Sequence, residues 1–208
     1  VDDGILNIFV QSKVQGNGFR SCTTQTLLTD LHQDEEEIFA QIKKGYRYDI
    51  RQSGKDNIDL ILNRSPSLKD IDEFCKFYNS FAKGIEIASA NRRKLIALMH
   101  SDALILSEAR DSAGLALVSH ALIYDNVRVR LLYSGSLHRE TGKEMKALIG
   151  RSNKALHWEE IKKFKDLAFK YYDFGGVSTD GSTENIDKFK LAFGGRKTVE
   201  YYAMNFNF

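Results

Sequence analysis

The chain has 208 residues and a mass of 23.7 kDa, of which 42% are hydrophobic and 28% charged. These values are typical of a soluble globular protein, and we expect residues 1–208 to form one domain. The net charge of +2 is too small to indicate a nucleic-acid or membrane partner.

The cysteines and the absence of long apolar runs indicate the cellular compartment of the protein. Cys22 and Cys75 are far apart and have no metal-binding or redox spacing, so idle thiols in a cytoplasmic protein are expected. The sequence contains no secretory signal and no apolar run of about 18 residues that would span a membrane. We therefore predict a cytoplasmic protein without a metal.

The first half of the chain alternates between strand-like and helical patterns. Apolar runs within residues 4–14 and 19–31 predict two strands around a Gly16-Asn17-Gly18 turn. Residues 34–53 are predicted to form a helix, because apolar residues recur at every fourth position and Asp34 with Glu37 has the form of a capping box. A strand over 57–63 and helices over 67–83 and 89–100 are expected next.

The middle of the chain has the clearest strand pattern. Residues 103–109, 115–124 and 127–132 are predicted strands, joined by hairpin turns at 111–114 and 125–126. A polar loop with room for a short helix is expected over 138–152, and a helix over 153–172. A final strand is expected over 198–208. This order predicts a mixed sheet with helices on its faces, which is an α/β or α+β fold.

The most informative segment is Tyr171-Tyr172-Asp173-Phe174-Gly175-Gly176-Val177 together with residues 186–195. We expect it to contain the end of a helix, a short strand, a glycine turn, a short helix and a second turn. Paired glycines allow positive φ angles and a close approach of another group to the backbone.

This segment resembles the C-terminal part of the Fem-type aminoacyltransferases, which have a GNAT-like N-acyltransferase fold. The resemblance covers roughly residues 23–195. It implies a single GNAT-like domain, of the acyl-CoA N-acyltransferase type, and an enzyme that transfers an acyl group.

Two neighbouring lysines of the predicted short helix differ in position. Relative to Ile186 on the apolar stripe, Lys190 lies about 40° away and Lys188 about 200° away at 100° per residue. Phe189-Lys190 matches the Phe-Lys pair of the Fem-type enzymes, in which the lysine stabilises charge on the acyl carbonyl. The resemblance therefore implies a catalytic Lys190 and a substrate-binding Phe189. A lysine with a buried stem and a wet amine is the alternative.

Asp173 and His120 are the other catalytic candidates. Asp173 could orient a basic group or bind an amine substrate, and it could equally bind backbone amides in a turn. His120 lies within a predicted strand and is a candidate general base, with an ordinary half-buried histidine as the alternative.

Arg47-Tyr48-Asp49-Ile50-Arg51 resembles a segment of the first helix in the same family. Basic residues recur there at every fourth position, so like charges repel along one stripe unless an anionic partner is present. The basic stripe and the resemblance together predict that Arg47, Tyr48 and Arg51 bind substrate. A solvated basic face is the alternative.

The cofactor expectation rests on a short string, Arg139-Glu140-Thr141-Gly142-Lys143-Glu144. Acetyl-CoA transferases carry a phosphate-binding loop of the form R/Q-x-x-G-x-G/A between a strand and a helix. Arg139 and Gly142 match its first part, while the second glycine is absent.

The sequence therefore predicts an N-acyltransferase that moves an acyl group, expected from acyl-CoA (acetyl-CoA), to an amine such as an amino sugar or a peptide amine. Two alternatives remain: an aminoacyl-tRNA-dependent cell-wall ligase of Fem type, and a non-catalytic domain that binds a sugar nucleotide or peptide. The expected partner is a small-molecule amine acceptor. A tRNA is allowed but not favoured, and a homodimer is allowed.

Overall fold

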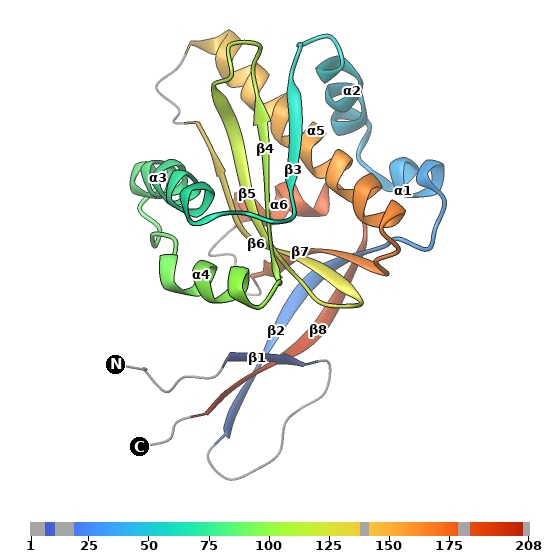
Figure 1. Ribbon diagram of the computed structural model, residues 1–208. Coiled ribbons are helices and arrows are strands. Elements are labelled where there is room, and N and C mark those ends of the chain that lie inside the picture. The colour runs from blue at the N-terminus through green and yellow to red at the C-terminus, as the bar shows by residue number, and fades with distance from the viewer. Residues whose placement is uncertain (1–6, 11–18, 138–141, 179–183, 206–208) are drawn as a thin grey trace.

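The computed structural model describes residues 7–10, 19–137, 142–178 and 184–205, with side chains from residue 23 to 201 within these ranges (Figure 1). The strands are β1 Asn7–Val10, β2 Phe19–Asp30, β3 Asp59–Asn63, β4 Leu104–Arg110, β5 Ala116–Tyr124, β6 Arg128–Ser136, β7 Tyr171–Val177 and β8 Arg196–Asn205. The helices are α1 Glu35–Gln41, α2 Lys44–Ser53, α3 Leu68–Gly84, α4 Arg92–His100, α5 Lys143–Asp166 and α6 Glu184–Leu191.

The strands form one 8-stranded sheet in the order β1-β8-β2-β7-β6-β5-β4-β3. Neighbouring strands are antiparallel except β6 and β7, which are parallel. Parallel neighbours require a long crossover connection, and α5 supplies it. A mixed sheet with helices on its faces confirms the predicted fold class.

Helices cover both faces of the sheet. On β4, Ile105 belongs to the core beneath α5, while Leu104 and Leu106 belong to the core beneath α3 and α4. This alternation follows from the strand pleat, which directs successive side chains to opposite faces. Each such buried aliphatic side chain contributes roughly 1.5–3 kcal/mol to stability.

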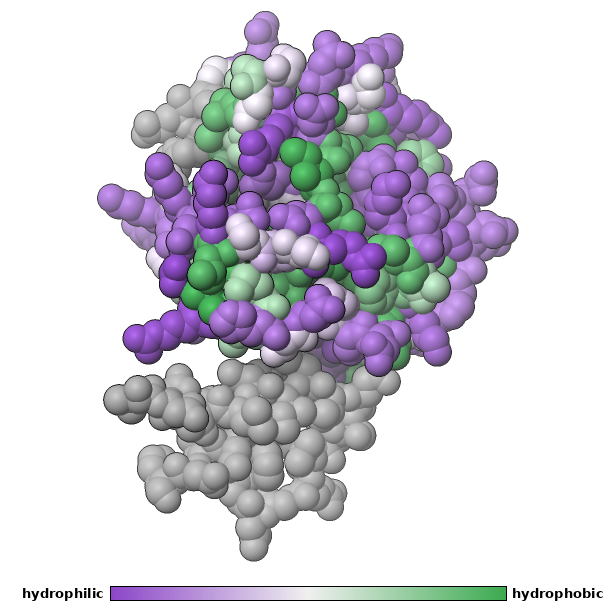
Figure 2. All heavy atoms as spheres, viewed as in Figure 1, coloured by the Kyte–Doolittle hydropathy of each residue, from purple (hydrophilic) through white to green (hydrophobic). Residues whose placement is uncertain are grey.

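The two edges of the sheet differ. The outer parts of β2 and β8 leave the body as a ribbon, with β1 paired to β8 (Figure 1). At the opposite edge, β3 carries apolar side chains among the hydrophilic ones that cover most of the face in Figure 2, and Ile61 is 43% exposed there. Among the described residues, no helix has both the length and the hydropathy that a membrane span requires.

The predicted three-strand meander is confirmed, since β4, β5 and β6 are adjacent and antiparallel. The prediction for the next segment is partly wrong. The loop expected over 138–152 contains the first turns of α5, which begins at Lys143, and the helix expected to reach residue 172 ends at Asp166. Ala168 has a positive φ of 63°, and the Lys170 amide donates to the Val127 carbonyl at 2.8 Å, so pairing with the sheet begins there.

The helix predicted over 34–53 is two helices. The capping box at Asp34 and Glu37 is present at the start of α1. The chain is then extended at Ile42, which is 1% exposed, and the Lys43 amide donates to the Ala192 carbonyl at 2.8 Å. This contact with the segment after α6 separates α1 from α2, so a tertiary interaction overrides the local helical pattern.

The turn between α6 and β8 requires glycine. Gly195 has φ +86°, and a Cβ atom there would lie 2.7 Å from the Leu28 carbonyl oxygen. Gly195→Ala is expected to lower the free energy of unfolding by more than the roughly 1–2 kcal/mol that the left-handed conformation alone costs. Gly114→Ala, at φ +81° with nothing within 4 Å, isolates that conformational cost. Urea unfolding checks both variants, and equal losses would contradict the steric argument.

Candidate functional site

The separation of the two parallel strands creates a cavity that we call the main cavity, although a cavity of about 500 Å³ between β3 and α5 is larger. β6 and β7 pair only from Arg128↔Tyr171 to Arg130↔Asp173, although β6 continues to Ser136 and β7 to Val177. A cavity of about 440 Å³ lies where they separate, and it is also lined by the end of α3, by α5 and by α6. The carboxyl ends of parallel strands are a common place for ligands, because connections leave a crevice there.

A second cavity of about 340 Å³ adjoins the first, and their walls share Ser136, Asn153 and Phe189. Tyr46 and Lys146 belong to the second cavity only. The two form adjoining compartments across Phe189. The wall on the α3 side of the first cavity is apolar and carries Tyr78, Phe81, Ile85 and Ile87.

The predicted glycine turn lies inside β7. Gly175 has φ +78°, and a Cβ atom there would lie 3.1 Å from the Leu131 carbonyl oxygen. Glycine therefore allows β7 to approach β6 closely at the base of the main cavity.

Lys190 lies in the wall of the main cavity, and its Nζ donates to the Gly176 carbonyl at 2.5 Å. Burial lowers the pKa of Lys190, and the nearby Asp187 and Asp173 oppose this shift. Lys188 is exposed and pairs with Glu184 at 2.6 Å. Phe189 lines both cavities. Whether Lys190 and Phe189 act on a substrate stays a prediction.

Asp173 is fully buried in a network of charges at the base of the separation. Its carboxylate accepts hydrogen bonds from Thr26, from Arg130 at 3.1 Å and from the Gly175 amide at 2.7 Å. Burial raises the pKa of Asp173, and the Arg130 charge opposes the rise. Glu200 completes the network by pairing with Arg128 and with Arg130, the latter at 2.6 Å. These contacts give Asp173 a structural role, and its predicted catalytic role stays untested.

His120 belongs to a buried polar cluster between the sheet and α5. Its Nδ1 lies 2.8 Å from the Glu160 carboxylate, and its Nε2 lies 3.2 Å from the Asn153 side-chain oxygen. Glu160 also accepts hydrogen bonds from Ser107 and from the Tyr172 hydroxyl, the latter at 2.5 Å. The alternative of a half-buried histidine is wrong, because His120 is 0% exposed.

The cluster reaches the main cavity through His157. His157 Nδ1 lies 2.7 Å from the Tyr172 hydroxyl, and the ring forms part of the cavity wall. Burial, together with the His120 charge, lowers the pKa of His157 to about 4, so the ring is neutral at pH 7. Burial alone would raise the pKa of Glu160, but His120 and the hydrogen bonds hold it well below its ordinary value.

His120, His157 and Glu160 also offer three potential metal ligands whose atoms lie within 4.8 Å of one another. Both Glu160 oxygens, however, already accept hydrogen bonds from neighbouring side chains. A cation at this place would have to displace those protons, so the donor set fits a hydrogen-bonded cluster better than a metal centre.

The remaining predicted residues that the structure describes lie away from the main cavity. Arg47, Tyr48 and Arg51 are on α2 and do not line it; Tyr48 is 62% exposed, and the Arg51 guanidinium lies 5.1 Å from the Phe39 ring centroid. Gly142 is the N-cap of α5, one turn before Lys146 of the second cavity. Arg139 lies outside the described residues. The binding roles of these residues stay predictions.

The sequence reasoning missed Glu160, His157, Asn153 and Tyr172. A signal for two of them was present: His157 and Glu160 are three residues apart, and Ile161 and Phe164 continue the same buried stripe of α5. Polar side chains on an inward-facing helical stripe indicate a buried polar cluster, because burial requires hydrogen-bond partners.

Comparisons with known proteins place this geometry among solved structures. FemX, 11% identical, superposes with a TM-score of 0.68 over 88% of this chain and 62% of the FemX chain. The C-terminal DUF2156 domain of a putative lysylphosphatidylglycerol synthetase from Agrobacterium fabrum is 12% identical. It superposes with a TM-score of 0.61 over 90% of this chain and 61% of that chain. A third structure is a GCN5-related glucosamine N-acetyltransferase region of a fungal multi-domain GH3 β-N-acetylglucosaminidase, which is 14% identical. It superposes with a TM-score of 0.51 over 91% of this chain and 21% of that chain.

The present chain spans about three fifths of the length of the first two structures. Neither a protein-family model nor a curated protein matches the sequence. At these identities the similarity shows the fold alone. The chain has a GNAT-like fold with Fem-type structural relatives, as the resemblance implies.

Proposed function

We propose that this chain is an acyltransferase that moves an acyl group from an activated donor to an amine within the main cavity. The observation that carries the proposal is the separation of β6 from β7 beyond Arg130 and Asp173, with the cavity of about 440 Å³ at that place. The exposed edge of β6 offers backbone amides and carbonyls to an extended ligand, as an unpaired strand edge does.

Acyl transfer is accelerated by hydrogen-bond donors or positive charge close to the carbonyl oxygen, where negative charge develops. Lys190 is the one charged side chain among the residues that line the main cavity in the described part of the chain. The apolar wall of Tyr78, Phe81, Ile85 and Ile87 would hold an aliphatic part of the donor or of the acyl group. A non-catalytic domain with a closed or filled cleft is disfavoured, because this cavity is open.

The proposed donor is an acyl-CoA. Its pantetheine arm is extended and has amide groups that match the free edge of β6. Lys146 lines the second cavity and would contact an anionic part of such a donor. One structural neighbour is described as a glucosamine N-acetyltransferase region, which agrees with an amine acceptor.

An aminoacyl-tRNA is the second candidate donor, and the exposed basic side of α2 favours it. Lys44 and Arg51 are exposed on this helix, and Lys55 comes directly after its C-cap, Gly54. Binding of a tRNA would rest on contacts between such residues and phosphates, so it would weaken steeply as salt rises.

The test is to add acetyl-CoA, longer acyl-CoAs or aminoacyl-tRNA and to measure thermal unfolding and transfer to amines. A ligand at 100 times its Kd that binds only the folded state stabilises it by about 2.7 kcal/mol. We expect an acyl-CoA to raise Tm and to release free CoA when an amine is present. Stabilisation by aminoacyl-tRNA alone would select the second donor. No stabilisation and no transfer with either would contradict the proposal.

A further inference from the structure

Glu160 is the centre of the buried cluster, and its surroundings define where the protons lie. Its side chain is 1% exposed and accepts from Ser107, His120 and Tyr172. A carboxylate that accepts three hydrogen bonds is held in its ionised form. The Tyr172 hydroxyl, kept protonated by burial and by the Glu160 charge, gives its single proton to this carboxylate.

The same bond fixes the tautomer of His157. Because the Tyr172 proton points to Glu160, the Tyr172 oxygen can only accept from His157, whose Nδ1 lies 2.7 Å away. Nδ1 of His157 therefore carries the proton of the neutral ring, and Nε2 carries the lone pair.

The ring of His157 forms part of the wall of the main cavity. Nε2 makes no hydrogen bond to any residue that the structure describes. Nε2 is also not fully enclosed by the described residues. It therefore has access to the cavity that the ring lines together with Phe174, Phe189 and Lys190.

We propose that His157 is the general base of the acyl transfer and that Tyr172 and Glu160 are the positioning residues that hold its Nε2 toward the amine. This inference rests on the proposed function. Through the Tyr172 hydroxyl, the Glu160 carboxylate stabilises the positive charge that His157 gains when it accepts a proton.

The step balances without a further reactant. As the amine nitrogen forms its bond to the acyl carbon, its proton moves to His157 Nε2, and the ring keeps its Nδ1 proton in the hydrogen bond to the Tyr172 oxygen. The bond from the acyl carbon to the leaving group then breaks. His157 gives the Nε2 proton to the leaving group and becomes neutral again, while Glu160 stays ionised throughout.

His157 holds two protons only while the tetrahedral intermediate exists. The charged groups that oppose a second proton are His120 on β5 and Lys190 on α6, while Glu160 on its own helix favours one. Tyr172 on β7 contributes an uncharged hydroxyl. Since the ring is neutral at pH 7, it is ready to accept a proton over the ordinary pH range.

The experiment compares His157→Gln and Tyr172→Phe with wild type for kcat and KM between pH 5 and 9. We expect His157→Gln to lower kcat by about 10²–10⁴ with little change in KM, as loss of a general base does. Tyr172→Phe keeps the ring packing and should also lower kcat. His100→Gln, on an exposed helix end, and Tyr124→Phe, bonded to Asp102 at 3.2 Å, are the matched controls and should retain full activity.

A second readout needs no substrate. Two-bond ¹H–¹⁵N correlation spectra of wild type should show His157 neutral and protonated at Nδ1 between pH 5 and 8, and Tyr172→Phe should lose this fixed tautomer. An Nε2-protonated ring, or full activity of His157→Gln in an active enzyme, would overturn the role of His157 alone. Tight stoichiometric binding of Zn²⁺ by wild type that is lost in His157→Gln would assign the cluster to a metal instead. Absence of transfer by wild type would overturn the proposed function together with this role.

Discussion

Lys190→Ala is expected to lower kcat for acyl transfer by about 10²–10³, which corresponds to about 2.7–4 kcal/mol of transition-state stabilisation. Nζ of Lys190 has two protons left after its bond to the Gly176 carbonyl and lies in the cavity wall. A contact that forms only as charge develops on the carbonyl oxygen lowers kcat and kcat/KM together. Steady-state and single-turnover kinetics measure both quantities.

The control is Lys188→Ala, two residues earlier on the same helix. Lys188 is exposed and pairs with Glu184 near the surface, a contact that contributes little to stability. Lys188→Ala should therefore retain the kcat and KM of the wild type. Because Lys190 also holds the Gly176 carbonyl, the unfolding free energy of Lys190→Ala must be measured in parallel. Equal and small kinetic effects at both positions would withdraw the catalytic assignment and leave Lys190 as a partly buried structural residue.

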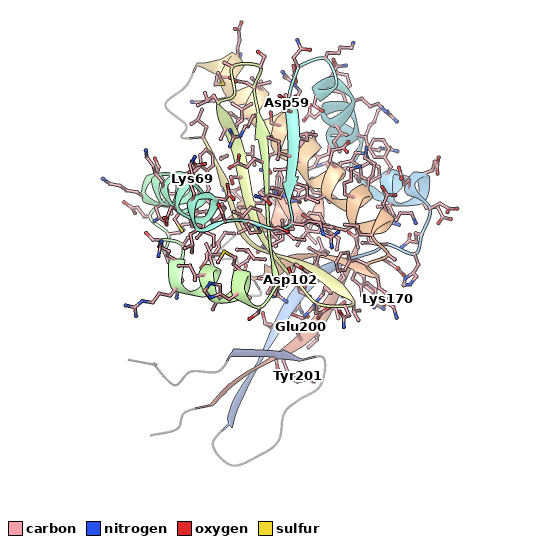
Figure 3. The ribbon with its side chains drawn as sticks, in the orientation of Figure 1. Asp59, Lys69, Asp102, Lys170, Glu200 and Tyr201 are labelled. Atoms are coloured by element: carbon pink, nitrogen blue, oxygen red, sulfur yellow. The ribbon has the colours of Figure 1, made fainter. Side chains whose placement is uncertain are left out.

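Glu200→Gln is expected to lower the free energy of unfolding by about 3–5 kcal/mol, because removal of one partner leaves buried charge uncompensated. Glu200 is 1% exposed on β8 and pairs with Arg128 and Arg130, both of which also contact Asp173. Figure 3 labels Glu200 where β8 leaves the body, so the network joins the ribbon to the central strands. Urea unfolding at pH 7 measures the loss.

The pH dependence gives this prediction a direction. Burial raises the pKa of Glu200, but the hydrogen bonds from Arg130 and Arg128 outweigh it and lower the pKa below 4.5. The stabilisation is therefore present above the unfolded pKa and is lost as the pH falls through the folded value. Glu200→Gln should show a smaller decline in stability on the acid side than wild type. Glu184→Gln, in an exposed pair, is the control. A loss as small as that of Glu184→Gln would mean that the buried network contributes no net stability.

Local patterns in the sequence predicted most of the elements. Alternation and turn residues located β4, β5 and β6, because a strand with buried faces and a tight turn leaves a direct record in the residue types. The helix predicted over 67–83 corresponds to α3, in which Ile71, Phe74, Cys75 and Tyr78 are buried. The capping box at Asp34 was likewise visible, since a cap depends on residues a few positions apart.

Boundaries depended on contacts between distant segments. The break between α1 and α2 follows from the Lys43 amide bonding to Ala192, and the start of β7 follows from residues 170–171 bonding to Val127. The sequence around each boundary is compatible with a continued helix, so only the tertiary partner decides where the helix ends.

The sequence by itself determined the order of strands and helices, the helical position of Lys190 relative to Lys188, and the need for glycine near residues 175 and 195. Only the tertiary structure decided which polar groups meet. His120 and Glu160 are 40 residues apart, and Asp173 meets Thr26 across 147 residues. The cavity itself exists because β6 and β7 stop pairing after Arg130 and Asp173, a separation set by the packing of both strands and not recorded in either segment alone.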